Sequence, residues 1–313
     1  MCASEQLAAA GAEAFVRNKS AGGEDLEKRP MNYAPVPEPL EIGVYDNHCH
    51  LEFAFDDAET PMDPIANLDL ASGVGMKGVV QVGVTLESSI WSAGFAAREP
   101  RVLAAVALHP NEAPLYETRA ELDAAIDVIG QLATQPRVRA IGETGLDFFR
   151  TEGEKSIAAQ RHSFERHIQI AKDNNIALMI HDRDAHADVV ETLLRVGAPE
   201  KVVFHCYSGE TDLAEICNEH GWYMSFAGNI TIKRNQHLRD SLKLAHRELI
   251  LIETDAPFLS PEPFRGRSNA PYLVPVTLRF MASELGLEVN EMARILNANT
   301  ERVYGSWAEG ITA

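Results

Sequence analysis

The chain alternates short apolar segments with longer segments of helical periodicity, and this alternation limits the folds open to it. In Ile157–Asp173, for example, Phe164, Ile168 and Ala171 follow the i, i+4, i+7 spacing of a buried helical stripe. Eight apolar runs have the length and the Val and Ile content of strands, and they lie at Val44–His50, Gly78–Val84, Val102–Leu108, Val138–Glu143, Ala177–His181, Val202–Cys206, Tyr223–Phe226 and Leu249–Asp255. Eight strands alternating with helices predict an α/β fold closed into a parallel (β/α)8 TIM barrel.

The alternative fold is an open, doubly wound sheet, which usually carries a glycine-rich phosphate loop after its first strand. Here the first strand runs into Asn47-His48-Cys49-His50 without a glycine, so the barrel is favoured. The length of 313 residues suits one barrel of about 250 residues and a short extension. Prolines at positions 30, 35, 37 and 39 predict a partly extended tail over residues 1–40, followed by a catalytic barrel over residues 41–313.

Charge and cysteine usage narrow the classes of partner. The formal net charge of −18 argues against a broad basic surface for nucleic acid, although bound divalent cations would reverse the potential at a small site. The four cysteines match neither a zinc ribbon nor a CxxC redox pair, which favours small buried residues in a reduced protein. No apolar run is long enough to span a membrane. We therefore expect a cytoplasmic protein without a membrane or an obligate protein partner.

Unusual polar residues follow several of the predicted strands, at the ends that meet on the active face of a barrel. His48 and His50 are two residues apart on one strand, so their side chains point to the same side. Taken alone, such a pair is as compatible with packing as with metal binding. His181 and His205 occupy corresponding positions at the ends of two successive strands, and this repetition favours metal ligands over isolated core histidines.

Two carboxylates complete the predicted centre. Glu143 ends an apolar run between two glycines, and its two oxygens can bridge two ions about 3.5–4 Å apart. Asp255 follows the last strand and is placed both as a ligand and as a proton acceptor, so these two carboxylates are the predicted catalytic residues. The donors suit two ions of Zn²⁺, Mn²⁺, Co²⁺ or Mg²⁺. The predicted ligands are His48, His50, Glu143, His181, His205 and Asp255.

Five motifs together resemble the TatD family of metal-dependent hydrolases over residues 41 to 305. They are Asp46-Asn47-His48-Cys49-His50-Leu51, Gly142-Glu143-Thr144-Gly145-Leu146-Asp147, His181-Asp182-Arg183-Asp184-Ala185, His205-Cys206-Tyr207-Ser208-Gly209 and Glu253-Thr254-Asp255-Ala256-Pro257. The resemblance implies an amidohydrolase-like barrel in which His48, His50, Glu143 and Asp255 hold one metal. It implies that Glu143, His181 and His205 hold the other.

The resemblance also implies a function, a deoxyribonuclease of 3′-to-5′ exonuclease or repair type that uses metal-activated water and acts on single-stranded DNA or 3′ ends. His109, Arg265 and Arg267 are predicted to contact substrate, because they follow strands on the same face and arginine suits phosphate. An acyl hydrolase, such as a D-aminoacyl-tRNA deacylase or small-molecule amidohydrolase, is the alternative. A non-catalytic binding protein is a third hypothesis. Six other histidines lie in helical patterns and are expected at the surface, namely His162, His167, His186, His220, His237 and His246.

Overall fold

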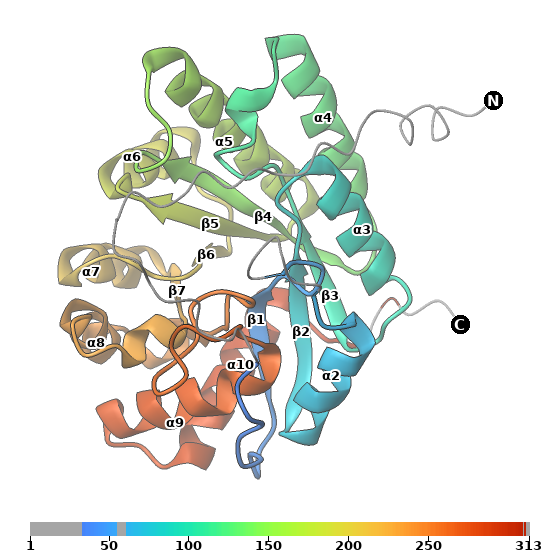
Figure 1. Ribbon diagram of the computed structural model, residues 1–313. Helices are drawn as coiled ribbons and strands as arrows, with labels where there is room; N and C mark the ends of the chain where they lie inside the picture. The colour runs from blue at the N-terminus through green and yellow to red at the C-terminus, as the bar shows by residue number, and fades with distance from the viewer. Residues whose placement is uncertain (1–32, 55–60, 309, 311–313) are drawn as a thin grey trace. The chain divides into compact units, whose positions relative to one another are not determined.

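A computed structural model describes residues 33–54, 61–308 and 310 of the chain. Within this part, eight strands pair in sequence order and in parallel to form the sheet of a barrel (Figure 1). The strands are β1 (Val44–Cys49), β2 (Met76–Val82), β3 (Val102–Val106), β4 (Val138–Asp147), β5 (Ala177–Arg183), β6 (Val202–Phe204), β7 (Tyr223–Phe226) and β8 (Ile250–Ile252).

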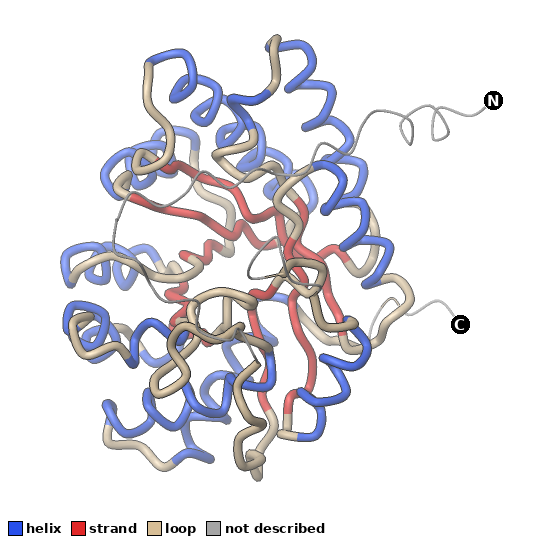
Figure 2. Tube along the Cα trace, viewed as in Figure 1, coloured by secondary structure: helices blue, strands red, loops and turns tan. Residues whose placement is uncertain are grey.

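Helices form an outer layer around these strands, as Figure 2 shows. The α-helices are α2 (Pro64–Gly73), α3 (Leu86–Ala96), α4 (Arg119–Leu132), α5 (Glu154–Asn174), α6 (His186–Val196), α7 (Thr211–His220), α8 (Gln236–Leu244), α9 (Val274–Leu285) and α10 (Val289–Tyr304). Short 3-10 helices lie at Ala113–Leu115, Gly228–Thr231, Arg247–Leu249 and Pro271–Leu273. Because helices cover the sheet outside and side chains fill it inside, strands such as β3 are buried along their whole length. No helix of the described residues is long and apolar enough to cross a membrane.

The predicted (β/α)8 barrel is confirmed, and all eight predicted strands exist, but several of their ends differ. β4 and β5 continue beyond their predicted ends, to Asp147 and Arg183. β6 and β8 stop earlier than predicted. Beyond these two strands, Cys206 and Asp255 have φ angles of 43° and 54°, in the left-handed region. The backbone therefore leaves the extended conformation there, and regular pairing ends.

The seam between β1 and β8 closes the barrel mainly through side chains. One isolated backbone bridge joins Cys49, the last residue of β1, with Ala256 in the segment that follows β8. Before this bridge along both strands, the Asn47 side chain donates to the Ile252 carbonyl (2.7 Å), and the Asp46 carboxyl accepts from Thr254. Asp46 receives both the backbone N–H (2.9 Å) and the hydroxyl (2.5 Å) of Thr254. This pairing fixes the residue before Asp255 against the strand that carries His48.

The predicted tail, residues 1–40, lies largely outside the described residues, which begin at Tyr33. Residues 33–40 have no regular secondary structure. Their backbone is held by side chains of the barrel: the Tyr272 hydroxyl donates to the Ala34 carbonyl (2.7 Å), and the Arg279 guanidinium donates to the carbonyls of Glu38 and Pro39 (2.8 and 3.0 Å).

His167 is not at the surface, contrary to the expectation for histidines in helical segments. Its ring is completely buried between α5 and the barrel. Its Nε2 accepts a hydrogen bond from the Leu108 N–H (3.4 Å), and its Nδ1 lies 2.9 Å from the Thr144 hydroxyl oxygen. Burial, with a contribution from Arg166, lowers the pKa of His167 to about 3. The folded protein therefore keeps this ring neutral.

We expect His167 to make the fold sensitive to acid. Between its ordinary pKa of 6.5 and its folded pKa of about 3, the unfolded chain binds a proton that the folded chain does not. Stability is thus lost as pH falls through this window, by about 2–3 kcal/mol between pH 6.5 and 4.5. Urea unfolding at both pH values should show this loss in the wild type and a smaller one in His167→Gln. The exposed His246 provides the control variant His246→Gln, and an equal loss in wild type and His167→Gln would contradict the assignment.

Candidate metal centre

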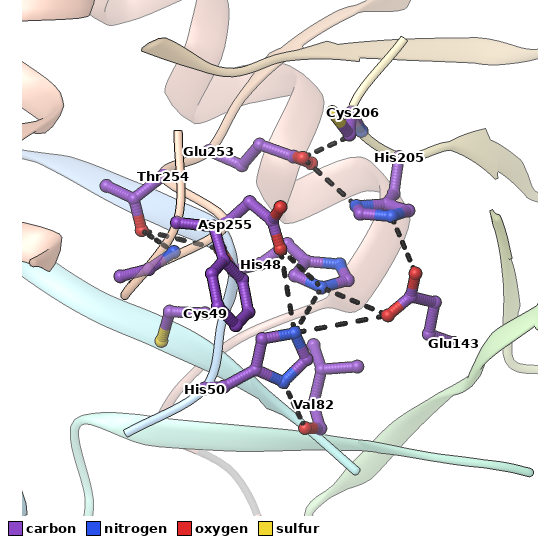
Figure 3. A network of polar contacts seen from close by, with 12 residues as sticks. His48, Cys49, His50, Val82, Glu143, His205, Cys206, Glu253, Thr254 and Asp255 are labelled. Atoms are coloured by element: carbon purple, nitrogen blue, oxygen red, sulfur yellow. Dashed lines mark hydrogen bonds and ion pairs between the residues drawn. The ribbon is translucent and has the colours of Figure 1, made fainter. Parts of the chain in front are cut away.

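The structure gathers the six predicted ligands at the carboxyl ends of the barrel strands. His48, Glu143 and His181 lie on β1, β4 and β5. The other three, His50, His205 and Asp255, lie in the segments that follow β1, β6 and β8. Figure 3 shows five of them pointing toward one another, namely His48, His50, Glu143, His205 and Asp255. The irregular pairing of β4 with β5 helps to form this arrangement. The register shifts between Ile141 and Thr144, so Glu143 lies in an irregularity of the strand.

Four donor atoms form a compact group. The Nε2 atoms of His48 and His50 lie 3.2 Å apart, and Asp255 Oδ1 lies 3.6 Å from each of them. Glu143 Oε2 lies 3.7 Å from His48 Nε2 and 3.9 Å from His50 Nε2. Donors held about 2.0–2.1 Å from one tetrahedral ion are separated from each other by about 3.3–3.4 Å. The observed separations are close to this value, so the group fits a divalent cation.

The outer ring nitrogens of two histidines are held in the way that metal-binding histidines require. His50 Nδ1 donates to the Val82 carbonyl oxygen (2.8 Å), which assigns the lone pair to the Nε2 that faces the group. His205 Nδ1 lies 3.1 Å from Glu253 Oε1, and the same oxygen accepts the Cys206 N–H (2.7 Å). Glu253, two residues before Asp255, therefore orients the His205 ring.

The two oxygens of Glu143 face different sets of imidazoles. While Oε2 faces the His48 and His50 pair, Oε1 lies 2.9 Å from His205 Nε2 and 2.6 Å from His181 Nδ1. The Glu143 side chain is 6% exposed, so water does not replace these partners. A carboxylate with separate donor sets on its two oxygens has the arrangement required to bridge two cations.

The electrostatics of the centre favour positive charge at its middle. Burial would raise the pKa of Glu143, but the neighbouring His205 and His109 imidazoles outweigh burial and hold that pKa well below its usual range. Burial lowers the pKa of His48 well below its ordinary value, and His205 adds to this shift. Glu143 is therefore ionised and His48 neutral near pH 7, the protonation states in which both side chains bind cations.

His109, which was predicted to contact substrate, lies within contact distance of two predicted metal ligands. Its Nε2 is 3.3 Å from His181 Nδ1 and 3.4 Å from Glu143 Oε1. The described residues thus contain three groups of donors able to hold an ion: His48–His50–Asp255, His48–Glu143–His205 and His109–Glu143–His181. Arg265 and Arg267 lie in the loop after β8 with exposed side chains. Among the described residues, neither guanidinium forms an ion pair with the six predicted ligands.

Asp147 also reaches the centre, although the sequence pattern predicted no role for it. Its Oδ2 lies 3.3 Å from His181 Nε2 and accepts a hydrogen bond from the Asn111 side chain (3.0 Å). Glu143, Gly145 and Asp147 alternate along one strand, so Asp147 points to the same side as Glu143. That alternation was the available signal, and it was missed because β4 was predicted to end at Glu143.

Comparison with known proteins decides the family. The family model described as TatD related DNase matches residues 45–305. A Mycobacterium tuberculosis H37Rv protein named uncharacterized metal-dependent hydrolase TatD is 38% identical over 266 residues, which cover 84% of this chain and 98% of the relative. The chain belongs to the TatD family. The resemblance inferred from the five motifs is therefore confirmed, and its predicted extent agrees closely with the matched residues.

Other TatD proteins are similar over the same region. The Escherichia coli K12 protein named uncharacterized metal-dependent hydrolase YcfH is 30% identical over 268 residues, covering 83% of this chain and 95% of the relative. The crystal structure of the TatD homologue YJJV from the same strain has a TM-score of 0.74 at 24% identity and covers 84% of this chain and 98% of its own. A TatD family protein from Entamoeba histolytica has a TM-score of 0.70 at 17% identity, covering 86% and 99%. These two structures share the barrel fold.

Proposed function

We propose that this member of the TatD metal-dependent hydrolases is a deoxyribonuclease acting on single-stranded DNA or 3′ ends. The observation that carries the proposal is the division of Glu143 between two donor sets, because a bridged pair of cations is a common arrangement for phosphodiester hydrolysis. The matching family model, described as TatD related DNase, supports DNA as the substrate.

In the proposed centre, one ion would be held by His48, His50, Asp255 and Glu143. Glu143, His181 and His205 would hold the other. His109 lies close enough to complete this second set. Nitrogen and carboxylate oxygen donors without a thiolate suit Zn²⁺, Mn²⁺, Co²⁺ or Mg²⁺. When bound, such ions act as Lewis acids that lower the pKa of water and neutralise charge on a phosphodiester.

The chain's own residues would hold the ions and accept the proton. Asp255 has a side chain 15% exposed, compared with 0% for His48 and 6% for Glu143, so it is the carboxylate of this group that a water at the mouth can reach. We assign it the role of accepting the proton of the attacking water. Glu253 positions His205 through the contact at Nδ1, and the Thr254–Asp46 pairing fixes the backbone before Asp255.

Substrate binding is proposed to be local and sensitive to salt. The net charge of −18 opposes DNA at a distance, so affinity depends on the centre itself and on cationic side chains near it. Arg265 and Arg267, exposed in the loop after β8, are proposed to contact phosphates. Each lost phosphate contact lowers the slope of log affinity against log salt by about 0.7 for a single strand.

The three cysteines within the described residues, Cys49, Cys206 and Cys217, are free thiols. Burial raises the pKa of the Cys49 and Cys217 thiols well above their ordinary value, so both are expected to be unreactive. Free cysteines are usual in the reducing cytoplasm, and we propose that location.

The nuclease proposal is tested with a 3′-labelled single-stranded DNA and purified protein, with added Mg²⁺, Mn²⁺ or Zn²⁺ and with chelator. We expect cleavage that requires metal and is lost on chelation. A parallel panel of carboxylic ester and amide substrates, including a D-aminoacyl ester, tests the acyl alternative. Acyl turnover by metal-loaded protein that leaves DNA intact would overturn the nuclease proposal and assign the same centre to acyl transfer.

A further inference from the structure

β4 and β5 continue as a paired ribbon beyond the metal centre. Gly145 pairs with His181 at the level of the ligands, and the ladder goes on until Asp147 pairs with Arg183. One further backbone hydrogen bond, from the Phe148 N–H to the Arg183 carbonyl (3.0 Å), extends it past the end of β4. In Figure 1 these two strands are long arrows in the barrel. The residues at the end of this ribbon therefore lie on the rim above the centre.

An aromatic ring and a guanidinium stack on each other at that rim. Arg183 Cζ lies 3.9 Å from the centre of the Phe149 ring, within cation–π distance. Phe149 is nonetheless 57% exposed, so much of the ring remains open to solvent. Among the described residues, the Arg183 guanidinium forms no ion pair. The preceding residue, Phe148, differs, because it packs against the hydrophobic core. Core packing thus accounts for Phe148 and leaves the exposure of Phe149 unexplained.

The ring is held in place rather than carried on a free loop. Asp147 Oδ1 accepts the backbone N–H groups of Phe149 (3.0 Å) and Arg150 (2.8 Å), which fixes the turn after β4. The other oxygen of Asp147 lies 3.3 Å from His181 Nε2. One carboxylate therefore connects the stacked pair with a residue of the metal centre.

The spacing suits a nucleic acid strand. His181 and Arg183 are two residues apart on β5, so they face the same side and are separated by about 7 Å along the strand. A phosphodiester at the metal centre would place an adjoining base near Phe149. Bases stack on aromatic rings without regard to sequence, and arginine adds a cation–π contribution.

We propose that Phe149 and Arg183 form a stacking platform for an unpaired nucleobase next to the scissile phosphodiester. The inference rests on the proposed nuclease function and makes its substrate more specific: a single strand with at least one unstacked base beside the bond that is cut. The platform selects for the presence of a base and tolerates all four.

Binding of hydrolysis-resistant phosphorothioate oligonucleotides to metal-loaded protein tests the platform. The two probes are a fluorescein-labelled oligothymidylate and an abasic strand of the same length, compared by anisotropy. We expect the wild type to prefer the base-bearing strand by about ten-fold, the scale of one stacked base. Phe149→Ala and Phe149→Leu should reduce that preference to near one, whereas Phe149→Trp should keep it. The leucine variant retains an apolar side chain, so a loss of the preference in this variant identifies stacking on the aromatic ring as the cause.

Leu194→Ala is the matched control, since Leu194 is 55% exposed and lies at the end of α6. It should leave the preference unchanged. If the wild type binds both strands equally, or Phe149→Ala keeps the preference, the platform is overturned. This binding result can be distinguished from the result of the cleavage test. A base preference that depends on Phe149 in a protein that cuts no DNA would retain the platform and reject the nuclease, and cleavage without the preference would do the reverse.

Discussion

Glu143→Gln is expected to reduce metal-dependent hydrolysis by about 10³-fold or more, the scale seen when a group that stabilises transition-state charge is removed. Glutamine has nearly the volume of glutamate but no charge, and it offers one acceptor oxygen in place of two. Its amide N–H groups would face either the His48 and His50 nitrogens or those of His181 and His205. In either orientation one donor set loses its shared carboxylate, so both the bound metal and the activity should fall.

The measurement joins two readouts on the same protein samples: metal content after reconstitution and dialysis, and the initial rate on labelled single-stranded DNA. Glu253→Gln provides a graded comparison. Glu253 contacts His205 from the side away from Glu143, so its loss should cost about 10–100-fold, as for other groups that orient a metal ligand. We therefore predict a larger loss of activity in Glu143→Gln than in Glu253→Gln.

Glu99→Gln is the matched control for the chemical change. Glu99 is also a buried glutamate, but it lies before β3, and its carboxylate accepts from the Arg101 side chain (2.8 Å). Its variant should keep the metal and the activity. If Glu143→Gln retained full metal content and rate, Glu143 would not bridge two ions, and the proposed centre would have to be rebuilt around the separate donor sets.

The barrel and the gathering of the six candidate ligands could be predicted because both depend on local patterns. Strand-length apolar runs alternate with helical stripes, and the carboxyl ends of parallel strands meet on one face. Residues such as His181 and His205, each at the end of its own strand, therefore had to lie near one another. No knowledge of side-chain geometry was needed for that step.

Contacts that depend on strand register could not be predicted in the same way. The shift in pairing between β4 and β5 near Glu143 has no signature in the apolar pattern. The apolar run itself ends at Glu143, so β4 was predicted too short and the alternation that reaches Asp147 fell outside it. The position of His109 beside His181 likewise depends on the register and tilt of strands that are distant in sequence.

His167 is a different case, because the signal was present. It lies three residues after Phe164 and four before Ala171, which places it on the same buried stripe of α5. That spacing predicts a buried ring and outweighs the general tendency of helical histidines to be exposed. A neutral histidine is acceptable in a core when its ring atoms have partners, as the Leu108 N–H and the Thr144 hydroxyl provide here.

The seam between β1 and β8 yields the largest expected effect on stability. Asp46 is completely buried and accepts hydrogen bonds from the His48 N–H (3.2 Å), the Thr254 N–H (2.9 Å) and the Thr254 hydroxyl (2.5 Å). Asp46→Ala would leave these donors without a partner in a site closed to water. Since each unsatisfied buried donor costs about 1–3 kcal/mol, we expect the free energy of unfolding to fall by about 3–5 kcal/mol.

Urea unfolding followed by circular dichroism measures this loss, with chelator present throughout so that altered metal binding near His48 does not contribute. Asp63→Ala is the control for the same substitution at the surface. Asp63 caps the start of α2 by accepting the Ala66 N–H (3.0 Å), and its loss should cost about 1 kcal/mol. Equal losses in the two variants would show that the Asp46 contacts do not stabilise the seam.

Asp46→Asn separates hydrogen bonding from charge at the seam. Burial raises the pKa of Asp46 to about 8, so near neutral pH the folded protein holds this group largely as the neutral acid. Asparagine keeps one oxygen for the backbone N–H groups, and its amide can donate to the Thr254 hydroxyl oxygen. We therefore expect a loss well below that of Asp46→Ala. A loss as large as in the alanine variant would mean that the seam requires the ionised carboxylate, and that Asp46 stabilises the strand ends bearing His48 and Asp255 through its charge.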